Sequence, residues 1–135
     1  MSEEKRRVDG YEHLAGMMKA LGHPVRLQIL EVLRRDEACV CHLETLLGQR
    51  QAYISQQLMR LRDAGLVVDR RDGLNVFYSL ADPSIGTLLD VARLVDTTRA
   101  GKAIIYPAAR EAGGACACPK CDPATTLAQA GENWP

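Results

Sequence analysis

The side chains best suited to chemistry in this 135-residue chain are its five cysteines, which fall into two groups. Cys39 and Cys41 form a C-x-C pair, and Cys116, Cys118 and Cys121 form a C-x-C-x-x-C group near the C-terminus. An odd number of cysteines cannot all pair within one chain, and clustered thiols in a reducing compartment favour metal binding over structural disulfides. The two groups therefore predict a thiolate site for a soft ion.

The spacing of the first pair places a mechanical condition on such a site. Residues i and i+2 of a regular helix point about 200° apart, so Cys39 and Cys41 could face one ion only where the first helical turn is unwound or becomes so. Thiolates prefer soft ions, and trivalent arsenic takes three of them. The pair would supply two thiolates and the C-terminal trio the third, although the trio could also hold an ion alone.

Composition limits the class of protein. Hydrophobic residues make up 47% of the chain but aromatic residues only 4%, so the core must be aliphatic. No apolar run reaches the roughly 18 residues of a membrane span, and the N-terminus lacks the apolar segment of a signal peptide. We therefore expect a cytoplasmic protein with no membrane partner.

The net charge is zero, so DNA binding would need a local basic face. Five arginines provide one: Arg50, Arg60, Arg62, Arg70 and Arg71.

Apolar residues recur at helical spacing over most of the chain. The pattern predicts helices over 11–21, from Pro24 to about 34–36, over 40–47, over about 51–64 and over about 84–98. Residues 1–10 and 101–135 lack it, so we expect a flexible N-terminus, one folded domain over 11–100 and a flexible cysteine-containing tail over 101–135. The apolar stripes of 11–21 and 84–98 exceed what one small domain needs.

The periodicity changes after Gly65. Two runs of strand-forming residues, 66–68 and 76–78, flank Asp72-Gly73, which is a strong hairpin signal. Two short helices, a tight turn and a following hairpin make a winged helix-turn-helix, a mainly α fold with a small β-hairpin. A helix fits the DNA major groove. The polar face of 51–62 would read bases with Gln, Ser and Arg side chains, including Arg60, while Arg70 and Arg71 near the hairpin tip would reach phosphates.

Three segments carry a family resemblance: LGHPVRLQILEVL, CHLETLLGQRQAYISQQLMRLRDAGLV and RRDGLNVFYSL. Together they resemble the ArsR/SmtB family of metal-responsive repressors over about residues 11–100. The resemblance implies a homodimer formed by the first and last helices, which binds double-stranded operator DNA and represses a resistance or efflux operon. It places the reading positions at Gln51, Ala52, Tyr53, Ser55, Gln56 and Gln57. Members often have His where Gln56 and Gln57 stand, and Arg where Leu74 stands.

The segment E-A-C-V-C-H-L, residues 37–43, is similar to the E-L-C-V-C-D-L box of arsenic- and cadmium/lead-responsive members. In the family this box opens the first helix of the helix-turn-helix. The resemblance implies As(III) or a soft divalent ion (Cd, Pb or Zn) as the effector that releases the repressor from DNA. His42 replaces Asp in the box and is either an additional nitrogen ligand or a surface residue.

Two other functions remain open from the sequence. One keeps the DNA-binding fold and replaces metal sensing by a disulfide between Cys39 or Cys41 and a tail cysteine. The other is an enzyme, a cysteine-dependent thiol transferase or arsenate reductase. The chain shows no C-x-x-C before a βαβ pattern and no Gly-rich phosphate loop, so we expect a protein that is not an enzyme.

Overall fold

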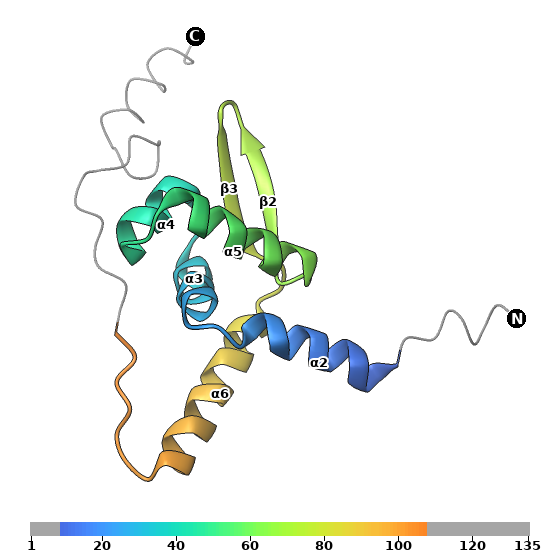
Figure 1. The fold of residues 1–135 in the computed structure, drawn as a ribbon, viewed down its shortest axis with the longest axis vertical. Coiled ribbons are helices and arrows are strands. Elements are labelled where there is room, and N and C mark those ends of the chain that lie inside the picture. The colour runs from blue at the N-terminus through green and yellow to red at the C-terminus, as the bar shows by residue number, and fades with distance from the viewer. Residues whose placement is uncertain (1–8, 108–135) are drawn as a thin grey trace, which may run out of the picture.

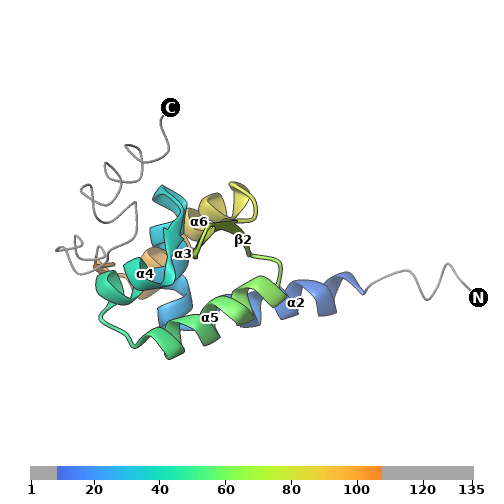
Figure 2. The same cartoon turned by 90° about the horizontal axis from the view of Figure 1, so that it is seen from above.

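The computed structural model describes residues 9–107, which form five helices and a small sheet (Figure 1). The chain order is α2 (Gly10–Leu21), α3 (Pro24–Arg35), β1 (Ala38–Cys39), α4 (Val40–Leu47), α5 (Gln51–Asp63), β2 (Val67–Asp72), β3 (Asn75–Leu80) and α6 (Ser84–Ala100). The expected winged helix-turn-helix is confirmed, with α4 and α5 as its helix pair and β2–β3 as its wing. Figure 2 shows α4 leading into α5 along one side of the molecule.

Local capping explains why the helices begin and end where the sequence predicts. The Asp9 carboxylate accepts hydrogen bonds from the first-turn amides of α2, and the His23 ring accepts one from Val25 N–H at the start of α3. Gly48 ends α4 with a φ of 64°, a left-handed conformation that glycine adopts without steric cost. The turn to α5 follows directly, so these caps fix the spacing of the helix-turn-helix.

The sheet has a third strand that the sequence pattern did not predict. β2 and β3 form the antiparallel wing, whose turn contains Gly73 at a φ of 61°. The two-residue strand β1 adds to the other side of β3, which gives the order β1-β3-β2. In this register Ala38 lies opposite Tyr78 and Cys39 opposite Phe77. The backbone before α4 is therefore hydrogen-bonded to the wing.

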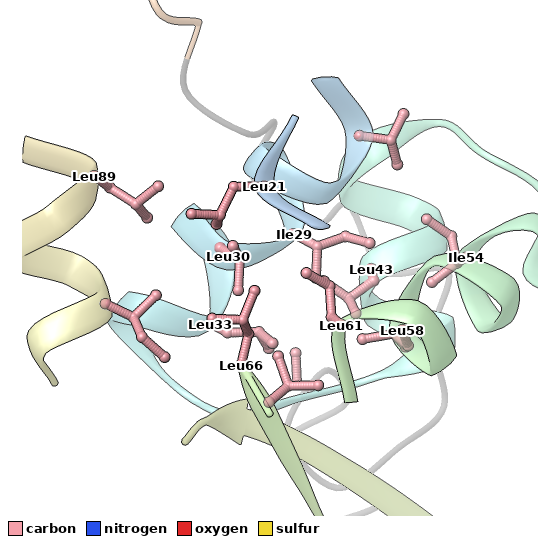
Figure 3. Close-up of a cluster of buried hydrophobic side chains, with 14 residues drawn as sticks. Leu21, Ile29, Leu30, Leu33, Leu43, Ile54, Leu58, Leu61, Leu66 and Leu89 are labelled. Carbon is pink, nitrogen blue, oxygen red and sulfur yellow. The ribbon is translucent and has the colours of Figure 1, made fainter. Parts of the chain in front are cut away.

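An aliphatic core holds α5 against the rest of the domain (Figure 3). Ile54, Leu58 and Leu61 form the inner face of α5 and are fully buried. They pack with Ile29 of α3 and Leu43 of α4 in one cluster. Truncation of such a residue to Ala costs roughly 2–5 kcal/mol, so this packing fixes which side chains of α5 face outward.

The terminal helices α2 and α6 diverge from this body (Figure 1) and leave apolar side chains exposed. On α2 these are Tyr11, Leu14 and Met18, and on α6 they are Val91, Leu94 and Val95. Arg34 of α3 donates two hydrogen bonds to Asp90 of α6, at 2.7 and 2.6 Å, which ties α6 to the body. None of the helices in residues 9–107 has the length and hydropathy that a transmembrane segment requires.

Candidate DNA interface and thiol site

The outward face of α5 presents a polar surface. Because the inner face is held by the core, the exposed side chains of this helix are fixed by its phase. Five of the predicted reading residues are exposed: Gln51, Ala52, Ser55, Gln56 and Arg60. Gln amides, Ser hydroxyls and Arg guanidiniums are groups that hydrogen-bond base edges in the major groove. The arrangement can therefore read DNA if α5 enters that groove.

Two predicted reading residues lie elsewhere. Gln57 is 6% exposed, and its side-chain oxygen accepts a 2.9 Å hydrogen bond from Arg26 Nη1. Arg26 also donates to the carbonyl of Ala20, so this contact joins α5 to the end of α2. Tyr53 is half-buried, and its hydroxyl lies 3.3 Å from His23 Nε2. Gln57 therefore stabilises the orientation of α5 and has no surface to offer to a base.

The two wing arginines differ in their surroundings. Arg71 is exposed, and among residues 9–107 it makes none of the ion pairs found within the domain. Arg70 donates two hydrogen bonds to the Glu37 carboxylate, the Nε one at 3.0 Å, and its guanidinium lies 4.9 Å from the centre of the Phe77 ring. The Glu37 carboxylate raises the pKa of Arg70 further above its ordinary value. Arg71 is thus the wing cation most available to a phosphate.

Cys39 and Cys41 meet at the start of α4. Cys39 is the N-cap residue, with extended backbone at φ −84° and ψ 166°, and Cys41 lies in the first turn. This change of backbone conformation brings the two sulfur atoms to 2.7 Å from each other. The condition set by the i,i+2 spacing is met because the helix begins after Cys39, with no unwinding required.

The Cys39 sulfur lies where a negative charge is favoured. It accepts a 3.3 Å hydrogen bond from the backbone N–H of His42, in the first turn of α4. Free amides and the dipole at a helix N-terminus stabilise anions, and thiolates are favoured at such positions. Cys39 is buried and Cys41 half-buried, so Cys41 is the more accessible of the two to solvent. His42 is half-buried beside them.

The thiol pair is connected to the wing through Phe77. Cys39 pairs with Phe77 in the β1–β3 ladder, and Arg70 pairs with Phe77 in the β2–β3 ladder. The Arg70 side chain also donates a hydrogen bond to Glu37, which lies two residues before Cys39 in the sequence. Glu37 and Phe77 were not among the predicted functional residues. The E-x-C-x-C pattern includes Glu37, but its partner lies 33 positions along the chain and no periodicity indicates it.

Cys116, Cys118 and Cys121 lie outside the described residues. Within residues 9–107, no group of three or more His, Cys, Asp or Glu side chains is arranged to hold a metal ion. The described part of the chain contributes the Cys39–Cys41 pair, and the predicted complete ligand set needs donors from elsewhere.

Comparison with known proteins assigns the family. The family model "Bacterial regulatory protein, arsR family" matches residues 23–68, which run from the N-cap of α3 into the wing. An uncharacterised HTH-type transcriptional regulator of Mycobacterium tuberculosis, Rv0081, is 45% identical over 86 residues, covering 63% of this chain and 75% of the relative. A transcriptional repressor SmtB homolog of Synechocystis is 40% identical over 81 residues, covering 60% and 61%.

Solved structures agree with the fold. The crystal structure of Rv0081 superposes with a TM-score of 0.65 at 40% identity, covering 70% of this chain and 96% of that one. The homodimeric winged helix-turn-helix DNA-binding domain of Mb0332 from Mycobacterium bovis gives 0.64 at 28% identity, covering 78% and 97%. The chain belongs to the arsR family of bacterial regulatory proteins, and it is a DNA-binding transcriptional repressor with a winged helix-turn-helix, not an enzyme.

Proposed function

We propose that this repressor acts in the cytoplasm as a homodimer that leaves its operator when As(III), or another thiophilic ion such as Cd, Pb or Zn, binds its cysteine thiolates. Cys39 and Cys41 supply two thiolates and the trio Cys116, Cys118 and Cys121 completes the set. The observation that carries the proposal is the 2.7 Å approach of the Cys39 and Cys41 sulfurs at the N-terminus of α4.

The donor set suits soft ions. Thiolates select ions of this class over hard ones, and a tetrahedral Zn site with bonds of about 2.3 Å would hold its sulfurs slightly less than 4 Å apart. The two sulfurs are 2.7 Å apart, so they would separate by about 1 Å to admit an ion between them. The helix N-terminus lowers the cost of negative charge on the Cys39 sulfur, which already accepts a hydrogen bond from the His42 amide.

Dimer formation is supported by the exposed apolar side chains of α2 and α6, which the body of the domain leaves uncovered. The Mb0332 neighbour with the same fold is homodimeric. A two-fold dimer would present two copies of α5 to successive major grooves, which matches a symmetric operator. In this arrangement α5 contributes Gln51, Ala52, Ser55, Gln56 and Arg60 to the interface, and the wing contributes Arg71.

The contacts around Cys39 offer a route from the ion to the DNA. Ligand binding would place an ion between Cys39 and Cys41 and move their sulfurs apart, and Cys39 is hydrogen-bonded in the sheet opposite Phe77. A shift of the 37–41 segment would therefore move β3 and the Glu37–Arg70 pair, and with them the wing. It would also move α4, which packs on α5 through the core. Coupling between ion binding and DNA binding requires that these contacts differ between the ion-free and the ion-bound protein.

A Glu37→Gln variant tests this route. Glutamine keeps the shape but removes the charge that holds Arg70, so we expect arsenite binding to persist and operator release to weaken. Allosteric coupling is typically about 1–3 kcal/mol, so the ratio of operator affinities without and with arsenite should fall by up to about tenfold. Glu44→Gln, also half-buried but on α4 away from Arg70, is the control. If the ratio of operator affinities without and with arsenite is the same in Glu37→Gln as in the wild type, the Glu37–Arg70 pair does not transmit the response.

The wing contact is tested by the salt dependence of DNA binding. Each phosphate contact contributes about 0.9 to the slope of log affinity against log salt, so Arg71→Ala in both subunits should flatten the slope by up to about two. Arg70→Ala should change it less, because Arg70 is held by Glu37. An unchanged slope for Arg71→Ala would exclude the wing from the DNA interface.

Direct binding to the thiolates is tested by near-ultraviolet absorbance of the reduced protein during titration with arsenite, Cd, Pb and Zn. Thiolate-to-ion absorbance should rise to one ion per subunit for at least one of them. An oxidant arm distinguishes redox sensing, since a protein that responds by disulfide formation would lose free thiols on oxidation and show no saturable absorbance with any ion.

A further inference from the structure

A groove of about 1040 Å³ runs across the domain between α3, α4 and α6. Its walls are mainly apolar and come from all three helices: Leu27, Val32, Leu46, Leu47, Leu89 and Ala92. Leu27 is 38% exposed. The volume is close to the upper end of the range of ligand pockets, about 300–1,000 Å³.

The lining of the groove includes both the neighbours of the thiol pair and the last described residues. Ala38 and His42, the immediate neighbours of Cys39 and Cys41, line the groove, and so do Tyr106 and Pro107. The chain after α6 thus turns back toward the body and ends its described course in the groove itself.

Specific contacts hold the chain at Tyr106. The Tyr106 hydroxyl donates a 2.5 Å hydrogen bond to Asp96 of α6, and Arg93 lies 4.7 Å from the centre of the Tyr106 ring. Arg93 is itself fixed by a 3.0 Å ion pair with Glu31 of α3. These contacts fix the position of Tyr106, the residue before the last one that the structure describes, at the wall of the groove.

We propose that residues 108–121 of the same chain occupy this groove and deliver a tail cysteine to Cys39 and Cys41 of their own subunit. The inference rests on the proposed function, and it adds that each thiolate site is built within one subunit and not across the dimer.

The length and composition of the segment fit this path. Cys116 follows Pro107 by nine positions, and nine residues span at most about 30 Å when extended. Residues 108–115, AAREAGGA, are alanine and glycine apart from one Arg and one Glu. Small side chains allow a backbone to lie close to groove walls, and the two opposite charges cancel.

The groove uses a face of α6 other than the exposed apolar face. Leu89 and Ala92 line the groove, whereas Val91, Leu94 and Val95 are exposed. A dimer formed through the second set leaves the groove open, so the tail of the same subunit can occupy it in the assembled protein.

Mixed dimers with equal numbers of cysteines separate the two arrangements. The first dimer joins a Cys39→Ser/Cys41→Ser subunit to a Cys116→Ser/Cys118→Ser/Cys121→Ser subunit. The second joins a wild-type subunit to one with all five cysteines replaced by serine. Each dimer carries five cysteines. A site within one subunit predicts that arsenite releases only the second dimer from DNA, whereas a site shared between subunits predicts release of only the first, which would overturn the proposal.

The parent homodimers distinguish failure of this inference from failure of the proposed function. If wild type responds to arsenite and both parent variants do not, the proposed function stands and the mixed dimers decide the arrangement. If the Cys39→Ser/Cys41→Ser homodimer still responds as wild type does, the proposed function fails first and the inference with it.

A groove variant tests the path itself. Ala92 is exposed in the groove, so Ala92→Trp fills the groove without disturbing the core, and Ala100→Trp on the same helix but outside the groove is the control. We expect Ala92→Trp to weaken arsenite binding by about tenfold, since a displaced tail loses its preorganised position. Equal arsenite affinity in the two tryptophan variants would contradict the path.

Discussion

Replacement of Cys39 or Cys41 by serine is expected to leave operator binding intact and to abolish release by arsenite. Each change removes one of the two thiolates that meet at the start of α4. Changes to groups that merely support a metal ligand already cost 10- to 100-fold in affinity, so loss of a ligand should cost on the order of 100-fold or more. Operator affinity with and without arsenite, measured by fluorescence anisotropy, gives the response directly.

The serine variants should remain folded. Serine is a favoured N-cap residue, so Cys39→Ser keeps the side-chain acceptor for the His42 amide and should melt within a few degrees of the wild type. The Cys39→Ser/Cys41→Ser double variant is the decisive case. If it leaves DNA at the wild-type arsenite concentration, the Cys39–Cys41 pair is not the sensor and the tail trio takes that role.

Gln56→Ala is expected to produce the largest loss of sequence-specific DNA binding. A bidentate contact between a Gln side chain and adenine contributes about 1–3 kcal/mol of discrimination. A dimer loses two such contacts, so affinity for a selected operator should fall by roughly 30-fold to 10⁴-fold, at about tenfold per 1.4 kcal/mol. Affinity for unrelated DNA, which depends on phosphate contacts, should hardly change.

Gln57→Ala is the matched control, because the neighbouring residue has the same chemistry and opposite exposure. Loss of the Gln57 side chain removes the 2.9 Å hydrogen bond that Arg26 donates to it. This should lower the free energy of unfolding by about 1–2 kcal/mol. The ratio of specific to non-specific affinity should stay near wild type. The assignment of α5 as the reading helix would be contradicted if Gln56→Ala kept that ratio and Gln57→Ala reduced it.

The helices could be predicted closely from the sequence because capping and periodicity are local. Pro24, Gly48 and Asp72-Gly73 mark boundaries that the structure confirms within two residues. The strand β1 could not be predicted in this way, since two residues show no alternation and their partners in the sheet, Phe77 and Tyr78, lie far along the chain.

Only part of the candidate site could be predicted from the sequence, because some of its contacts also join residues far apart in the chain. The resemblance placed both Gln56 and Gln57 among the DNA-reading positions. Adjacent helix positions point about 100° apart, however, and packing against α3 decides which of the two side chains is buried. Arg70 and Arg71 likewise differ only through Glu37, which no spacing rule connects with the wing. The proposed role of the Cys39–Cys41 pair rests on residue type, whereas the geometry of the pair depends on where α4 begins.

The central claim is that thiolate ligation releases the repressor from DNA, and one titration tests it most directly. Reduced wild-type protein is bound to an operator selected from a random duplex library, and arsenite is then added with Cd, Pb and Zn in parallel. We predict that at least one of these ions releases the DNA at about one equivalent per subunit, and that a chelating dithiol restores binding. Full operator occupancy at excess of all four ions, with release by an oxidant alone, would contradict the claim.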